Sequence, residues 1–492
     1  MKPTEFSAIP FLELSRWQRL ALAVALGALL HFALRLEPVW WMAWLAPAPL
    51  LAVALRSRAG EARWTMLVAA LTGFAPNLPY LYSVVGIAGA PLIVLLLSLL
   101  WMAIVMATRR IVLRYPRWWT VFAYPLLWAG ADTLMANLLP DGNWNSLAYT
   151  QAGFLPALQA SALAGAAGVV FVLSLPASAL ALLVARGSAL RHAWRAAAAA
   201  ALPVAAVLAY GALRLQAPLE GQQAAFGLAA IDDAIGPQTS AATAAAIWQR
   251  YEQQAETLAR QGARIIVLPE KIAILSPEQA AQQRQRLAAL AARLGVWIEA
   301  GVGTDDGQHR QNLAWLLAPQ GESPPTYQKH YLAPPEREFQ PGSDYTLQNV
   351  GELRYGVAIC KDMHFGVFGR AYGVRGADVM LVPAWDFGAD RHLTAAMTAM
   401  RGVENGYTVV RAARDGLLSV HDPYGRVLAM RDSAPMPGAT LLATVQAGPQ
   451  LATLYTRTGD AFGWLCTAIA AVLVVLSRRR PSLTATRAAV AA

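Results

Sequence analysis

Cysteine is almost absent from this chain of 492 residues, which has only Cys360 and Cys466. Cys466 lies in an apolar run near the C-terminus, so the sequence offers neither a disulfide framework nor a cysteine-rich zinc site. Cys360 ends the apolar run 355–359 and precedes the polar stretch 361–364. A thiol at the mouth of a buried strand is placed to act as a nucleophile, and a buried core cysteine is the alternative.

Charged residues are also scarce. They make up 14% of the chain, against 56% hydrophobic residues, whereas soluble domains carry about 25%. Residues 1–215 hold long apolar runs, residues 216–455 have the composition of a globular domain, and a final apolar run covers 461–476. We therefore expect a multi-span α-helical membrane domain at 1–215 with seven spans, a globular domain at 216–455, and a last span with its tail at 456–492.

The apolar runs predict eight membrane spans, because about 20 apolar residues are needed to cross a bilayer. The spans are expected near 18–35, 39–55, 65–83, 88–107, 118–138, 158–184, 196–213 and 461–477. Pro76, Asn77 and Pro79 interrupt the third. The first is too long for a signal peptide and is interpreted as a retained anchor.

Positive charge gathers in alternate connections between the predicted spans. Arginines precede the first span and follow the second, fourth, sixth and eighth, and the other connections are poor in them. The positive-inside rule then predicts that both termini are cytoplasmic and that the 216–455 domain lies on the outer side. The net charge of +10 reports this topology and contact with anionic membrane lipids, and not nucleic-acid binding.

The 216–455 segment alternates predicted strands and helices, which is typical of an α/β layered sandwich. Strands are expected at 225–231, 264–268, 296–302, 313–318, 351–359, 378–382, 408–412 and 427–430, and helices at 243–261, 277–294 and 392–405.

Three polar residues follow apolar runs or lie in a connection between them: Glu270, Lys329 and Cys360. In layered α/β folds, chemistry lies beyond the carboxyl ends of the strands. Each residue has an ordinary alternative, such as a helix-capping glutamate or a solvated loop lysine. Their occurrence together, in this order, favours one catalytic group.

These segments resemble the Glu-Lys-Cys triad of the nitrilase, or carbon-nitrogen hydrolase, superfamily. The whole chain resembles the membrane branch of that superfamily, the apolipoprotein N-acyltransferases. The likeness rests on 268–270, 327–332, 356–360, 382–385, 401–405, the pre-anchor segment 455–460 and the loop segment 142–149. It implies an αββα four-layer nitrilase-like domain.

The resemblance also implies an activity. Glu270 would serve as base, Cys360 as the nucleophile that carries an acyl thioester, and Lys329 as the stabiliser of the oxyanion. The donor would be a phospholipid and the acceptor the N-terminal diacylglyceryl-cysteine of a lipoprotein. No cofactor and no metal are implied. The location would be the bacterial inner membrane, with the catalytic domain on the periplasmic side.

Further residues are supporting candidates. In this superfamily a second carboxylate assists the lysine, and Glu338 aligns better than Glu336, which is the alternative. Trp385 is expected to line the acyl pocket or to be a core aromatic residue. After Cys360, the family shows an aromatic residue and then glutamate, whereas this chain has Lys361 and Asp362.

The departures after Cys360 leave three alternatives open. The chain could be a divergent acyltransferase with another acceptor amine, with His364 as a second base or as a structural residue. It could be a membrane-anchored amidase in which water resolves the thioester. It could also be a silent scaffold, against which the intact Glu270, Lys329 and Cys360 argue.

Overall fold

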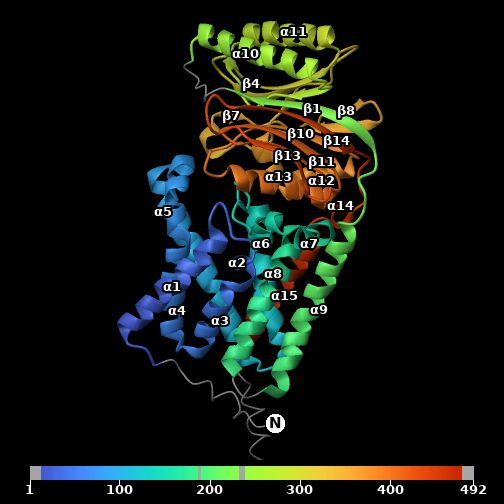
Figure 1. The fold of residues 1–492 in the computed structure, drawn as a ribbon. Coiled ribbons are helices and arrows are strands. Elements are labelled where there is room, and N and C mark those ends of the chain that lie inside the picture. Colours follow the sequence, from blue (N-terminus) through green and yellow to red (C-terminus); the bar gives the residue numbers. More distant parts are fainter. Residues whose placement is uncertain (1–12, 187–189, 232–238, 479–492) are drawn as a thin grey trace, which may run out of the picture.

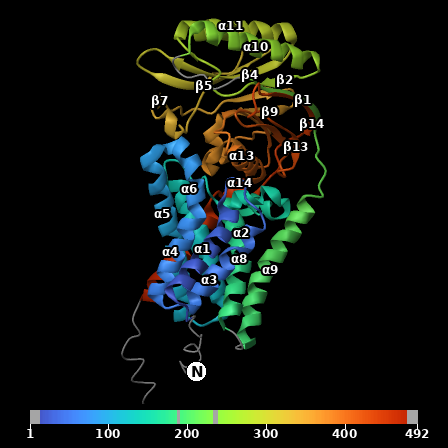
Figure 2. The ribbon, with the colours of Figure 1, turned by 60° about the vertical axis from the view of Figure 1, so that its left-hand side comes forward.

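The computed structural model describes residues 13–186, 190–231 and 239–478. It has two parts, a bundle of helices and an α/β domain stacked on one end of that bundle (Figures 1 and 2). The chain enters the α/β domain from helix α9 (Leu190–Arg214) into strand β1 (Gln222–Ala230). It returns through α14 (Leu454–Thr458) to α15 (Ala461–Arg478). The α/β domain is therefore an insertion before the last long helix, as the composition predicted.

The bundle consists of mostly apolar helices. Besides α9 and α15 they are α1 (Arg16–Leu34), α2 (Met42–Leu45), α3 (Pro47–Arg56), α4 (Ala59–Phe74), α5 (Leu78–Arg114), α6 (Ala123–Leu138), α7 (Leu155–Leu158) and α8 (Ser161–Arg186). Within the described ranges, five stretches are long and apolar enough to cross a membrane, with 59–114 counted as one. The division into eight spans stays a prediction.

The predicted third span, 65–83, has the wrong boundaries. The structure ends α4 at Phe74 and inserts a 3-10 turn, Ala75–Asn77, before α5 begins. Pro76 and Pro79 explain the break, since proline removes a backbone donor and clashes with the preceding turn. A second bend follows at Gly86, whose φ of 76° is left-handed. The 78–85 segment of α5 therefore runs at an angle to the rest of that helix, toward the α/β domain (Figure 1).

The arginine-rich helix ends meet at one end of the bundle. Arg19 at the start of α1 pairs with Glu61 at the start of α4 at 2.8 Å. Arg109 near the end of α5 donates to the carbonyls of Ala54 and Ser57, next to the end of α3. Since α9 passes from this end to the α/β domain, the basic end lies opposite that domain (Figure 1).

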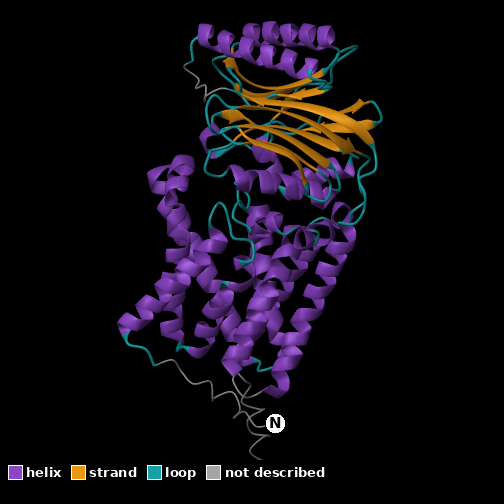
Figure 3. Ribbon diagram, in the orientation of Figure 1, coloured by secondary structure: helices purple, strands orange, loops and turns teal. Residues whose placement is uncertain are grey.

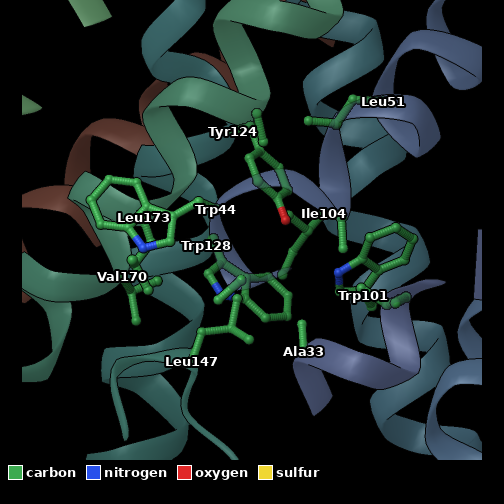
Figure 4. Packing of buried hydrophobic residues seen from close by; sticks show 14 of the residues in the cluster. Ala33, Trp44, Leu51, Trp101, Ile104, Tyr124, Trp128, Leu147, Val170 and Leu173 are labelled. Carbon is green, nitrogen blue, oxygen red and sulfur yellow. The ribbon is translucent and has the colours of Figure 1, made fainter. Parts of the chain in front are cut away.

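The bundle core is built from large aromatic and branched side chains. Figure 4 shows Trp44, Trp101 and Trp128 among aliphatic neighbours that include Leu51 and Val170. Residues from α13 (Arg391–Asn405) of the α/β domain, among them Met397 and Met400, belong to the same buried cluster. Burial of apolar surface across this junction fixes the α/β domain against the bundle.

The α/β domain contains two stacked sheets. The first has the order β14-β1-β2-β4-β5-β6, with β3 on β4 and β7 on β5; the second has the order β13-β12-β11-β10-β9-β8. The remaining strands are β2 (Ile265–Val267), β3 (Ile274–Leu275), β4 (Trp297–Asp305), β5 (Arg310–Leu317), β6 (Tyr327–Gln328), β7 (Phe339–Gln340), β8 (Leu347–Val350), β9 (Leu353–Val357), β10 (Val379–Trp385), β11 (Thr408–Arg414), β12 (Leu417–His421), β13 (Val427–Asp432) and β14 (Ala439–Ala447).

Helices cover both outer faces of the stacked sheets. Helices α10 (Ala241–Arg260) and α11 (Pro277–Leu294) pack on the first sheet, while α12 (Gly366–Val374) and α13 lie on the second. Figure 3 shows the resulting helix–sheet–sheet–helix layers above the bundle. The predicted αββα four-layer sandwich is confirmed, and its α13 layer is the one that faces the membrane helices.

The orientation can be tested with reporter fusions. A reporter fused after Ser57 follows the basic end of α3, and one fused after Gly307 lies in the β4–β5 turn of the α/β domain. We expect the two to report opposite sides of the membrane, with Ser57 cytoplasmic, because of the arginine asymmetry. Reports from the same side would contradict the predicted topology.

Candidate active site

Lys329 joins two carboxylates in the interior of the α/β domain. It follows β6, and its Nζ lies 2.7 Å from Glu270 Oε1 and 2.7 Å from Glu336 Oε2. Lys329 and Glu270 are each 1% exposed. Buried charges of this kind persist only when they are paired, so the three side chains form one electrostatic unit.

Two residues that the sequence did not single out complete this network. Asn312 Nδ2 donates to Glu270 at 2.6 Å and to Glu336 at 2.9 Å. Lys271 Nζ donates to Oε1 of Glu336, whereas Lys329 contacts Oε2. Asn312 lies on β5 between the polar Arg310 and Gln311 and the apolar run 313–317, and no sequence pattern marks it as buried.

Cys360 begins a 3-10 turn, Cys360–His364, directly after β9 and Ile359. Its φ of 43° is left-handed, which costs a non-glycine residue about 1–3 kcal/mol. The Asp362 carboxylate holds the turn by accepting from the backbone N–H of Ile359 at 2.9 Å and of Tyr331 at 2.8 Å. The predicted supporting residue Asp362 therefore shapes the turn that carries Cys360.

Backbone strain concentrates at this site. In the part of the chain that the structure describes, three non-glycine residues have left-handed φ values, namely Lys271, Cys360 and Asp415. All three line one cavity. Strain of this kind persists where the surrounding structure over-determines the backbone, as at catalytic centres.

The environment of the site gives the Cys360 thiol and the Lys329 amine different charges. Burial raises the pKa of Cys360, and the Glu270 carboxylate raises it further, so the resting thiol is protonated. Its Sγ lies 3.6 Å from the carbonyl oxygen of Trp385, to which it donates. Burial alone would lower the pKa of Lys329, but Glu270 and Glu336 outweigh it and keep that pKa well above its ordinary value. The site thus pairs a neutral thiol with a permanent cation.

The cavity has a volume of about 610 Å³ and is shared by the two parts of the molecule. Glu270, Lys329 and Cys360 line it from the α/β domain. Apolar residues of α5 line it from the bundle, including Leu81 and Ile93. A polar, charged end and an apolar wall therefore meet in one cavity, which suits a ligand with both a polar group and an apolar chain.

Trp385 lies where the sequence predicted a pocket residue. It lines the cavity at the end of β10, and the guanidinium carbon of Arg414 lies 3.8 Å from its ring centroid. The next residue, Asp386, makes a buried ion pair with Arg411. These contacts fix the cavity wall next to Cys360.

The preference for Glu338 as the second carboxylate at the lysine is wrong. Glu338 pairs with Arg310, and its side chain is 59% exposed. Glu336, at the end of the 3-10 turn Pro334–Glu336, is the carboxylate that contacts Lys329. The turn carries Glu336 inward and leaves Glu338 outside, which an alignment by spacing could not foresee.

The two glutamates make a matched pair for mutagenesis. Glu336→Gln should lower the catalytic rate about 10- to 100-fold, the usual effect of removing a residue that orients a reacting group. Glu338→Gln should stay within about twofold, because its exposed ion pair is screened by solvent. Steady-state rates of the two variants show which glutamate matters more. A larger loss of rate in Glu338→Gln than in Glu336→Gln would contradict the assignment of Glu336.

Asp362 gives the site an expected pH dependence. Burial raises its pKa from the ordinary range to about 6. The carboxylate that holds the turn is therefore lost as the pH falls through about 6, and any activity that depends on Cys360 should fall with it. A pH–rate profile should show this acid limb in the wild type, and Asp362→Asn should be slow at every pH and lack the limb. An unchanged profile in Asp362→Asn would contradict this role.

His364 lines the cavity too, and burial with nearby cations holds its pKa well below the ordinary value. Among the described residues, no group of three or more His, Cys, Asp or Glu side chains is arranged to hold a metal ion.

The fold and the site define the α/β part as a carbon-nitrogen hydrolase domain, and residues 229–448 match the family model of that description. Residues 26–179 match the model of the apolipoprotein N-acyltransferase N-terminal domain. The apolipoprotein N-acyltransferase of Geobacter metallireducens is 30% identical over 518 residues, covering 94% of this chain and 96% of that protein. The chain belongs to the apolipoprotein N-acyltransferase family.

Other relatives show lower identity. The apolipoprotein N-acyltransferase of Gloeobacter violaceus is 28% identical and covers 93% of this chain and 94% of its own. An amidase from Nesterenkonia sp. has a solved structure that is 20% identical, with a TM-score of 0.40, over 50% of this chain and 96% of that one.

Proposed function

We propose that this protein transfers an acyl chain from a phospholipid, through a thioester on Cys360, to the N-terminal diacylglyceryl-cysteine of lipoproteins. The observation that carries the proposal is the shared cavity, in which Cys360, Glu270 and Lys329 meet apolar side chains of the membrane helix α5. Family membership supports the choice of donor and acceptor.

In the first half-reaction, Glu270 takes the proton of the Cys360 thiol, and Sγ attacks the ester carbonyl of the phospholipid. Lys329 and the backbone N–H of Lys361 stabilise the oxyanion of the tetrahedral intermediate. The intermediate collapses, the C–O bond breaks, and the lysophospholipid leaves with the proton returned by Glu270. One such oxyanion donor is worth about 3 kcal/mol.

In the second half-reaction, the neutral amine of the acceptor attacks the thioester carbonyl. Glu270 accepts a proton from the attacking nitrogen and gives one to the departing thiolate, so that the amide forms and the thiol is restored. Because the pKa of Cys360 is raised, its sulfur is a poor leaving group as a thiolate, and the proton that Glu270 gives it is needed for this step. Two successive covalent steps predict ping-pong kinetics.

The proposed location is the bacterial inner membrane, with the α/β domain on the periplasmic side. The concentration of arginine at the opposite end of the bundle supports this orientation. Both proposed substrates are lipids of that membrane. The cavity that would receive them is lined by the bundle and by the α/β domain.

The experiment is transfer by the purified protein in vesicles that contain labelled phospholipid. With a diacylglyceryl-cysteine peptide added, the label should move to the peptide amine. Release of the label as free fatty acid at the same rate with or without peptide would instead indicate the amidase-like alternative. Transfer to other amines, but not to this peptide, would indicate a divergent acceptor.

A further inference from the structure

The loop 139–146, between α6 and the 3-10 helix Leu147–Gly153, reaches from the bundle to the nucleophile turn. Its Asp141 accepts a hydrogen bond from Lys361 Nζ, the side chain directly after Cys360. Its Gly142 lies against Phe365 at the other end of the turn, since a Cβ at Gly142 would be 3.2 Å from the Phe365 ring. The loop therefore touches the turn on both sides.

Lys361 is fixed by few groups. It is 5% exposed, and its Nζ donates to Asp141 and, at 2.9 Å, to the carbonyl of Leu332. Burial lowers the pKa of Lys361, and Asp141 counteracts this, while Arg337 and Lys329 lower it further. Without the Asp141 carboxylate, a buried ammonium would face those cations with a single carbonyl to accept from it. The side chain would then leave its position or lose its charge.

The position of Lys361 matters because its backbone follows a strained residue. Cys360 has the left-handed φ of 43°, and such a conformation persists only where its surroundings hold it. Asp362 holds the turn from within the α/β domain. Lys361 connects the turn to the bundle through its hydrogen bond to Asp141. Arg337, which donates to both oxygens of Asp141 at 2.7 and 2.9 Å, keeps that carboxylate oriented.

We propose that Asp141 is a positioning residue: through Lys361 it holds the backbone N–H after Cys360 in the geometry that thioester formation requires. The bundle thus contributes to catalysis through a polar contact as well as through the apolar wall of the cavity. Asp141 acts through Lys361 and not on the reacting carbonyl. The inference rests on the proposed role of Cys360 as nucleophile.

The test is single-turnover acylation of the full-length protein in phospholipid vesicles, followed by intact mass, together with kcat and KM for transfer. Asp141→Asn should slow acylation about 10- to 100-fold and lower kcat, with the KM for phospholipid within about twofold. Asp141→Glu should recover most of the rate, because it restores the carboxylate. Lys361→Met should match Asp141→Asn, and the double variant should be no slower than either single one.

Controls separate this role from a general loss of structure. Arg293→Gln, which breaks a solvent-accessible ion pair between α11 and Glu256 on α10, should leave both rate and melting temperature unchanged. If Asp141→Asn does not accumulate, Lys361→Met carries the same prediction from the other end of the pair. Wild-type rates in either variant, a loss confined to KM, or additive losses in the double variant would overturn the inference. Absence of an adduct in the wild type would instead refute the proposed function.

Discussion

Replacing Cys360 with alanine is expected to abolish both acyl transfer and the covalent adduct. The thiol lies in the shared cavity with Glu270 and Lys329, and alanine removes the only atom there that can carry the acyl group as a thioester. Covalent catalysis has no alternative route once its nucleophile is lost, so the rate should fall to background. The measurement is intact mass after incubation with phospholipid vesicles, alongside transfer to the acceptor peptide.

Cys466 supplies the matched control, because it is the one other cysteine of the chain. It lies in the apolar helix α15, buried against the bundle, where a thiol stays inert. Cys466→Ala should therefore keep both the adduct and the transfer near wild type. Equal losses of adduct and transfer in Cys360→Ala and Cys466→Ala would contradict the proposal that Cys360 is the nucleophile.

Glu270→Gln is expected to prevent thioester formation itself. Glutamine keeps the shape of the side chain but cannot take the proton, and burial holds the Cys360 thiol protonated because its pKa is raised. The contact with Lys329 at 2.7 Å would also lose its charge, so the lysine would be left with Glu336 alone. Single-turnover acylation should show no adduct on the timescale of wild-type turnover.

Lys329→Met separates the oxyanion role from the base. It should slow both half-reactions by about 100-fold or more, the scale of losing one electrostatic stabiliser. A Glu270→Gln variant that acylates at the wild-type rate would mean that another group deprotonates Cys360. His364 would then be the first suspect, since Asp362 already accepts from Tyr327, Ile359 and Tyr331.

The sequence indicated the residues of the candidate site more readily than their surroundings, for a physical reason, and their catalytic roles stay predictions. Glu270, Lys329 and Cys360 each follow or connect apolar strands, and the layered fold brings such positions to one edge of the sheets. The alternation of strands and helices predicted an α/β layered sandwich, and the family resemblance supplied its αββα order of layers. Strands β3, β6, β7, β8, β12 and β14 and helix α12 were not predicted.

Long-range contacts were outside the reach of local patterns. Asp141 meets Lys361 across 220 positions of sequence, and no periodicity reports such a pair. Asn312 follows the polar Arg310 and Gln311 at the start of β5, so the sequence does not distinguish it from an ordinary exposed residue. Glu336 and Glu338 are two positions apart, and the backbone turn between them, which spacing does not specify, decides which one reaches Lys329.

The central claim is that Cys360 carries an acyl chain taken from a phospholipid. The most direct test is the intact mass of the protein purified from native membranes, followed by peptide mapping of the adduct. A fatty-acyl mass on the peptide that contains Cys360, removed by hydroxylamine and by the acceptor amine, is the predicted result. An unmodified Cys360 in the wild type after incubation with phospholipid, with transfer proceeding at the full rate, would contradict the account.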